Sequence, residues 1–128
     1  MISMLKGRKG QSMVEFALIV PLLLILVLGI EEFGRAWMTK NILTGATREA
    51  VRIMAVTGNN AAASARADNV LRSSGITTAN ISVTNASVAY DPVSVTVTYN
   101  FPILFQFIPG LNRASIPLSS TTTMRREY

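Results

Sequence analysis

Residues 6–30 read KGRKGQSMVEFALIVPLLLILVLGI, and this stretch decides the fold. Three basic residues lead to Gly10, a single acid, Glu15, follows five positions later, and residues 16–30 carry no charge. A lipid environment explains the apolar run, but it does not explain the acid. Because an ionisable group just inside a membrane helix is costly, Glu15 is a candidate functional residue.

The apolar run is long enough to cross a membrane. Extended to residues 14–33, it reaches the lower end of the roughly 17–25 residues that a spanning helix needs. It differs from a cleaved secretory signal, because its apolar part is too long and no Ala-x-Ala site precedes Glu31 and Glu32. The basic leader favours a cytoplasmic N-terminus, and Phe33 and Trp37 suit an aromatic belt on the far side. We therefore expect a single pass with most of the chain outside.

Composition argues against catalysis. Among 128 residues there is no Cys and no His, which removes disulfides, thiolate metal sites and the commonest general base. We therefore predict no enzyme, metal, cofactor or small-molecule substrate. The net charge of +5 falls on a leader, because a chain starting at Gln11 keeps nine basic and seven acidic side chains. A nucleic-acid partner is not expected, since it would need basic residues grouped on one face.

The helix is expected to continue beyond the membrane over residues 34–56, with Glu31 and Arg35 spaced for an ion pair. Within the membrane part, Pro21 is either a kink that lipid tolerates or a point that loosens when copies pack together. Beyond it, one narrow stripe recurs in steps of four and three. The stripe packs either on this protein's own strands, which is favoured beyond Ala46, or on other subunits. Its members are Thr39, Leu43, Ala46, Ala50, Ile53 and Thr57.

The remaining residues predict a small head. Gly58 is expected to stop the first helix, and Asn60 to cap a second one over residues 61–74. Residues 93–101 alternate between apolar and polar side chains, which predicts a half-buried strand. A tight turn at Tyr90-Asp91-Pro92 indicates antiparallel pairing with an earlier strand that either bulges near Asn85 or is split in two.

A last strand is expected over residues 114–124, which makes the fold class α+β. In this fold a long N-terminal helix, whose first half spans the membrane, and a short second helix pack on a small antiparallel sheet. The apolar segment 101–110, which includes Phe105 and Phe107, is expected to be core, a contact with the outer leaflet, or a contact with another subunit.

The N-terminal stretch is similar to a known family. Gly10 followed by Gln11-Ser12-Met13-Val14-Glu15-Phe16 resembles the processing site of class III (type IVb, Flp/Tad) prepilins, which are cut after the glycine. The run continuing to GIEEFGRA at residues 29–36 resembles the TadE-like pseudopilins, as does ATREAVR at residues 46–52. The end of the chain, TTTMRRE at residues 121–127, resembles theirs more loosely. Phe16 stands where the major pilins usually carry Tyr, and the chain is longer than theirs, which favours a minor pseudopilin.

The resemblance implies partners and a place in the cell. A prepilin peptidase would cut between Gly10 and Gln11 at the bacterial inner membrane. The helix would then assemble with other pilin or pseudopilin subunits on an inner-membrane platform. One outcome would be extraction of the subunit into a filament at the cell surface. Glu15 and Phe16 would set the assembly register, and the pilin-like helix and head would supply further subunit contacts. Candidate contacts are Pro21, Arg35, Leu43, Ala46, Ala50, Phe105 and Phe107.

Elementary electrostatics gives Glu15 a role in such an assembly. Cleavage after Gly10 would create an ammonium on Gln11, about one helical turn away, and a neighbouring copy's ammonium could reach the same carboxylate. An ion pair removed from water is favourable only when its geometry is good. Glu15 would therefore favour the correct axial register between neighbouring helices. The alternative is that Glu15 lies in the headgroup region and reaches toward water.

We therefore expect a basic leader (1–10), a transmembrane helix (11–33), its continuation outside the membrane (34–56) and an α+β head (57–128). The function predicted is that of a structural TadE-like minor pseudopilin of a Tad/Flp-type pilus or a related secretion filament. The first alternative is an uncleaved single-pass envelope protein whose outer domain binds a partner. A major filament subunit and a membrane-tethered enzyme are the remaining alternatives.

Overall fold

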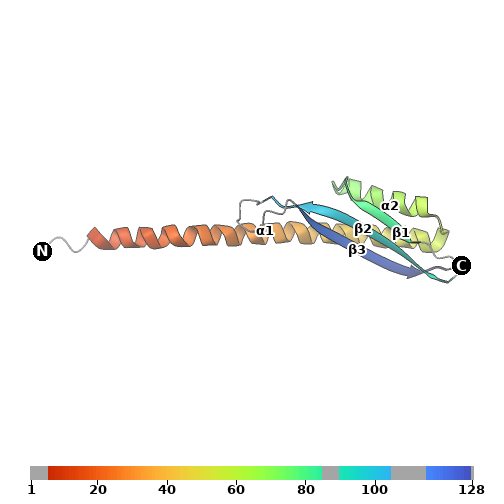
Figure 1. Cartoon of the computed structure of the whole chain (residues 1–128), viewed down its shortest axis with the longest axis horizontal. Helices are drawn as coiled ribbons and strands as arrows, with labels where there is room; N and C mark the ends of the chain where they lie inside the picture. The colour runs from red at the N-terminus through yellow and green to blue at the C-terminus, as the bar shows by residue number, and fades with distance from the viewer. Residues whose placement is uncertain (1–5, 85–89, 105–114, 128) are drawn as a thin grey trace. The chain divides into compact units, whose positions relative to one another are not determined.

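The structure is a computed structural model, and it describes residues 6–84, 90–104 and 115–127. The elements follow one another as α1 (Lys6–Thr57), α2 (Asn60–Ser73), β1 (Asn80–Thr84), β2 (Pro92–Pro102) and β3 (Ser115–Arg125). Figure 1 shows the two helices and the strands of the sheet. The predicted α+β class, with a long first helix, a short second helix and a small antiparallel sheet, is confirmed.

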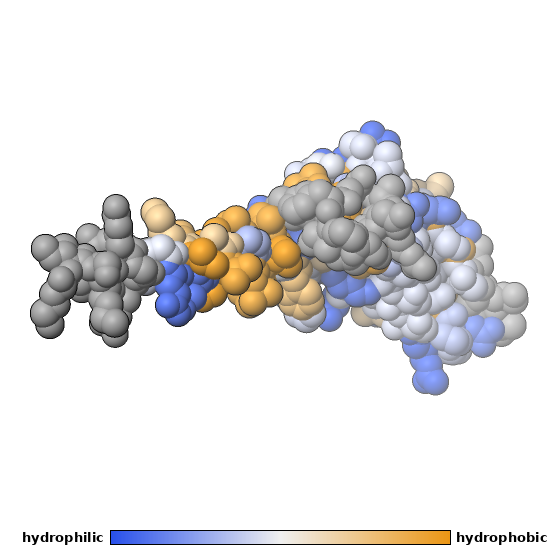
Figure 2. Space-filling view, turned by 60° about the vertical axis from the view of Figure 1, so that its left-hand side comes forward, coloured by the Kyte–Doolittle hydropathy of each residue, from blue (hydrophilic) through white to orange (hydrophobic). Residues whose placement is uncertain are grey.

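The chain divides into two compact units, Met1–Gly34 and Arg35–Tyr128. The first holds the apolar part of α1, whose large side chains are exposed along its length. In Figure 2, hydrophobic side chains cover the visible side of this part of α1. The four domain boundaries expected from the sequence stay predictions.

The second unit is a three-stranded sheet with both helices on one face. The strands pair antiparallel in the order β1-β2-β3, with Val95 opposite Val83 on one side and Thr122 on the other. The alternation in β2 is confirmed, because Val93, Val95 and Val97 are fully buried. Their partners in the core come from α1, α2 and Ile76, which follows α2. The helical partners are Leu43, Ala46, Ala50, Val51, Met54, Ala55, Ala63, Ala67 and Leu71.

Among the residues that the structure describes in the three strands, those on the opposite face of the sheet are mostly polar, and Arg125 at one end is the charged one. Hydroxyl and amide residues of the three strands lie in register there, and Thr96 and Thr121 approach with their hydroxyl oxygens 2.9 Å apart. The set comprises Asn80, Ser82, Thr84, Ser94, Thr96, Thr98, Ser119, Thr121 and Thr123.

The break between the helices follows from one glycine. Gly58 has a φ of +64°, which a residue with a Cβ adopts only at a cost, and its N–H donates to the Met54 carbonyl at 2.9 Å. The expected cap at Asn60 is wrong by one residue. Asn59 is extended, and its side chain accepts the Ala62 N–H at 3.1 Å, so Asn60 is already the first residue of α2.

The turn before β2 is also present. Tyr90 has a φ of +70°, and β2 begins two residues later at Pro92. The predicted bulge near Asn85 lies outside the described residues. Of the apolar segment 101–110, Phe101 and Ile103 are buried and Leu104 is exposed, whereas residues 105–110 lie outside the described part.

Candidate functional site

The predicted processing and assembly residues lie in the first turns of α1. Gly10, Gln11, Glu15 and Phe16 are all exposed. The Gln11 side-chain amide donates to the Glu15 carboxylate, with Nε2 and Oε1 3.3 Å apart. A solvent-exposed contact of this length is weak, so the carboxylate can exchange it for a stronger cationic partner.

The bond that the resemblance marks for cleavage, between Gly10 and Gln11, lies inside a helix, because α1 begins at Lys6. Helix ends fray, and a glycine in a helix interior costs about 1 kcal/mol relative to alanine. Gly10 therefore lowers the stability of the helix at this bond.

The helix that carries these residues has an uncovered apolar surface. In the part of the chain that the structure describes, α1 is the one helix long and apolar enough to cross a membrane, and none of its most apolar 18-residue window is buried. A core helix of a soluble protein would be covered. A contiguous apolar surface of this size calls for lipid or for partner helices. Pro21 lies within this surface, and α1 continues through it.

The other predicted contact residues fall in the second unit. Leu43, Ala46 and Ala50 are fully buried beneath the sheet. A side chain with no exposed surface cannot touch another subunit unless the head opens, so the structure favours packing on this protein's own strands. Phe105 and Phe107 lie outside the described residues.

Arg35 is placed at the start of the second unit, where its guanidinium carbon lies 5.1 Å from the centre of the Phe101 ring. Its backbone carbonyl accepts the Thr39 hydroxyl at 3.0 Å. The guanidinium thus keeps a cation–π contact with a largely buried aromatic ring.

A cluster of hydroxyl groups that was not predicted from the sequence joins α1 to β3. Thr47 approaches Thr122 with 2.8 Å between their oxygens, and Thr44 approaches Ser120 at 3.2 Å. Lys40 donates to the Ser119 carbonyl nearby. The signal available in the sequence was that Ser120 and Thr122, at inward positions of β3, are polar. Their partners in β2 are valines.

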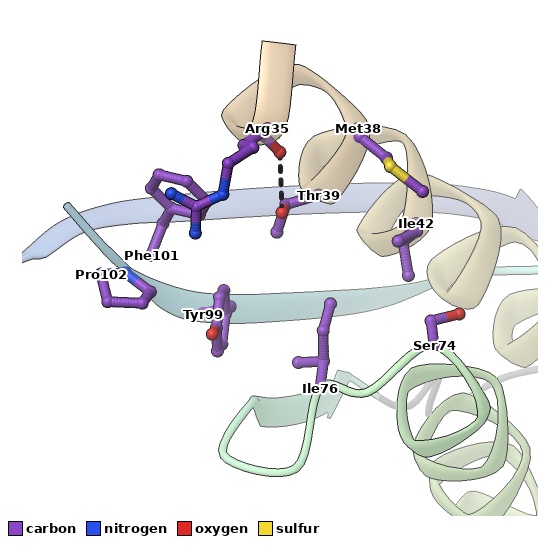
Figure 3. A pocket seen from close by; sticks show the side chains of 9 residues that line it. All are labelled: Arg35, Met38, Thr39, Ile42, Ser74, Ile76, Tyr99, Phe101 and Pro102. Atoms are coloured by element: carbon purple, nitrogen blue, oxygen red, sulfur yellow. Dashed lines mark hydrogen bonds between the residues drawn. The ribbon is translucent and has the colours of Figure 1, made fainter. Parts of the chain in front are cut away.

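A pocket of about 220 Å³ opens between α1, β2 and the segment after α2 (Figure 3). In Figure 3, Ile42 and Ile76 point toward each other across it, and Arg35 lies over Phe101 at one end. No sequence pattern indicates this pocket, because its walls come from three separate segments. Its lining is Arg35, Met38, Thr39, Ile42, Ser74, Ile76, Tyr99, Phe101 and Pro102.

Together these features define a small α+β domain carried on one N-terminal helix that could span a membrane. Residues 10–52 match the family described as TadE-like protein, which confirms the resemblance over the N-terminal helix and the start of the domain. The match begins at Gly10 and includes both Glu15 and Arg35. Neither the curated proteins nor the solved structures include a significant match.

Proposed function

We propose that the protein is a minor pseudopilin of a Tad/Flp-type pilus or a related secretion filament. It is inserted with its N-terminus in the cytoplasm, cut after Gly10 by a prepilin peptidase, and assembled through α1. The observation that carries the proposal is the register of the family match. The match starts at the glycine, and Glu15 and Phe16 follow it at the entrance to an apolar and uncovered helix.

The exposure of Glu15 supports a role outside the single chain. Within α1 its partner is a neutral amide, whereas the ammonium formed at Gln11 by cleavage would be a charged one. In a bundle of such helices the carboxylate leaves water, and an unpaired buried charge costs roughly 3–5 kcal/mol. An axial register that brings an ammonium to each carboxylate avoids that cost, and displaced registers do not.

The remaining parts have supporting roles. The apolar surface of α1 holds the subunit in the inner membrane and then packs on neighbouring helices or the assembly platform. The head contributes contacts through surfaces that its own core does not use, which excludes the fully buried Leu43, Ala46 and Ala50 from that role unless it opens.

The first test is the intact mass of the protein recovered from its native membrane. We expect a chain that begins at Gln11, and we expect Gly10→Val to retain the leader, because a β-branched residue blocks close approach at the cut. If the native chain keeps its first ten residues, it is an uncleaved envelope protein and the pseudopilin proposal fails.

The second test separates anchoring from assembly. Glu15→Gln keeps the size of the side chain and removes its charge, so we expect normal insertion and cleavage but loss of the subunit from purified filaments. Glu31→Gln is the matched control, because Glu31 is also an exposed acid of α1 but lies at the other end of the apolar run. Equal recovery of the two variants in filaments would show that Glu15 does not set register.

A further inference from the structure

The pocket of the second unit suits a single side chain with an apolar body and a polar tip. Its volume of about 220 Å³ is below the roughly 300 Å³ at which pockets for free small molecules begin. Ile42 and Ile76 face each other across it (Figure 3), and Met38 adds a thioether, which makes favourable contacts with aromatic rings. Thr39 and Ser74 also line the pocket. Their hydroxyls donate to backbone carbonyls one helical turn earlier, so each oxygen can still accept a hydrogen bond.

The same unit displays a tyrosine in a strained backbone position. Tyr90 has a φ of +70°, and its side chain is 66% exposed. A positive φ is an outlier for a bulky residue, and glycine or asparagine would form this turn at a lower cost. An exposed ring gives the head little burial in return for that strain. Strain of this kind points to a contact with another molecule, and tyrosine is enriched among the residues that anchor such contacts.

Tyr90 and the pocket lie at opposite ends of the second unit. Tyr90 precedes β2, whose last residue, Pro102, lines the pocket. At about 3.3 Å per residue, the strand separates them by roughly 30 Å. Backbone hydrogen bonds support this placement, because the Asp91 carbonyl accepts from Arg126, and the next N–H along the chain donates to Ala55 near the end of α1. No side chain spans such a distance, so Tyr90 cannot enter the pocket of its own chain.

We propose that Tyr90 of one copy enters the pocket of a second copy. Its ring lies between Ile42 and Ile76, and its hydroxyl donates to a hydroxyl oxygen of the lining, as a buried tyrosine requires. Because the two halves of the contact lie at opposite ends of one unit, the contact is head-to-tail and joins copies in a row.

The contact is small and acts between copies that are already neighbours. A buried tyrosine removes about 150–250 Å² from water, whereas a stable interface buries at least roughly 1,200 Å². The apolar surface of α1 is the part that brings copies together, and to that extent the inference rests on the proposed function. It requires only that two copies of this chain be adjacent.

Disulfide cross-linking tests the contact directly, because the chain has no cysteine of its own. Asp91→Cys places one thiol beside Tyr90, and Ser74→Cys places one at the pocket, both at exposed positions. The two full-length variants are expressed together with different tags, and native membranes and filament fractions are oxidised with copper phenanthroline. We expect a covalent dimer between differently tagged chains and none from either variant alone.

The control replaces Ser74→Cys by Thr121→Cys, which is exposed on the outer face of the sheet and should give no product with Asp91→Cys. Absence of the mixed dimer from both fractions, or an equal yield in the control, overturns the proposal. A dimer from one variant alone would indicate a two-fold contact and would also overturn it.

Three further variants test the anchor itself in the cross-linking background. Tyr90→Gly removes both the ring and the strain, so it should raise the melting temperature of the head and still lower the yield of mixed dimer about tenfold or more. Tyr90→Phe is the matched control, because it keeps the ring and should keep most of the yield. Met38→Trp fills the pocket from an exposed position and should lower the yield as Tyr90→Gly does. Should Met38→Trp fail to fold, Tyr90→Gly decides alone, and full cross-linking by a folded Tyr90→Gly chain would show that Tyr90 is not the anchor.

Failure of this inference is distinguishable from failure of the proposed function. If filaments contain the chain but neither they nor the membranes yield the mixed dimer, this inference alone fails. If Met38→Trp keeps the chain out of filaments while no mixed dimer forms, the pocket takes a different subunit, which also overturns the assignment to a second copy. A chain that keeps its first ten residues and is absent from filaments defeats the pseudopilin proposal, whereas a mixed dimer in its membranes would still support the contact.

Discussion

Two regions of one helix use leucine in opposite ways. In the first unit Leu22 is 69% exposed, whereas in the second unit Leu43 is fully buried. Both positions are helical and lie on α1, so helix formation does not distinguish them. The difference is that Leu43 belongs to a buried core with residues of β2 and α2, whereas Leu22 lies outside that core. The same side chain therefore stabilises the head in one place and requires lipid or another subunit in the other.

The largest expected effect comes from separating the head from the second part of α1. Residues 57–128 alone lose every α1 member of the core, including Leu43, Val51 and Met54. We expect no cooperative melt for this fragment and a cooperative melt for residues 35–128. Circular dichroism on heating measures both. A cooperative transition above 60 °C for the shorter fragment would show that the sheet and α2 suffice.

The dependence of the head on α1 also shows which features could be predicted from the sequence and which could not. The alternation over residues 93–101 and the stripe from Leu43 to Ala50 each predicted a buried face, because one element and its period suffice for that. Which faces meet was left open, since the stripe had two interpretations. The hydroxyl cluster and the pocket could not be predicted, because each depends on the register between segments far apart in the chain.

The candidate site shows the same division. Glu15 stood out because an acid beside an apolar run is locally unusual, and no other element was needed to notice it. Arg35 was noticed for its spacing from Glu31 and as a candidate subunit contact, whereas its position over Phe101 depends on a strand more than sixty residues later. Local rules find a residue that is unusual within its own segment, and they miss a residue whose contacts depend on the fold.

A matched pair of leucine truncations sharpens the comparison between the two regions. Leu43→Ala should destabilise the head by about 2–5 kcal/mol, because it removes a fully buried side chain and leaves a cavity. Leu22→Ala should leave the unfolding of the head unchanged in detergent, since Leu22 is not part of its core. Denaturant titration of the full chain gives both values. Equal losses at the two positions would mean that the head depends on the first unit.

Substitutions in the hydroxyl cluster test whether hydrogen bonds hold β3 on α1, in contrast to the apolar packing of β2. Thr47→Val keeps the shape of a fully buried side chain but removes the partner of Thr122 and the donor to the Thr44 carbonyl, so we expect a loss of about 1–3 kcal/mol. Thr96→Val on the outer face is the control. Water can replace its hydrogen bond and valine suits a strand, so the change should stay within about 0.5 kcal/mol.

The smallest effects are expected from Gly→Ala substitutions, which separate the cost of backbone strain from the cost of a steric contact. Gly58 and Gly75 both have positive φ, but a Cβ at Gly58 would lie 2.7 Å from an Arg126 guanidinium nitrogen, whereas one at Gly75 meets nothing within 4 Å. Each change to alanine should cost about 1–2 kcal/mol from the backbone. The guanidinium is the end of a flexible side chain, so Gly58→Ala should exceed Gly75→Ala only slightly.

Gly45 gives the opposite sign, because it lies inside α1 and an added Cβ there meets nothing within 4 Å. Gly45→Ala should therefore stabilise the head by up to about 1 kcal/mol, through the lower entropy of the unfolded chain. The three melting temperatures in one buffer rank these effects. If Gly45→Ala instead destabilises the isolated chain, another part of the same chain packs closely against Gly45. If it stabilises the isolated chain but weakens recovery in filaments, the helix needs that small surface for a neighbouring subunit, and α1 has an external contact beyond its apolar half.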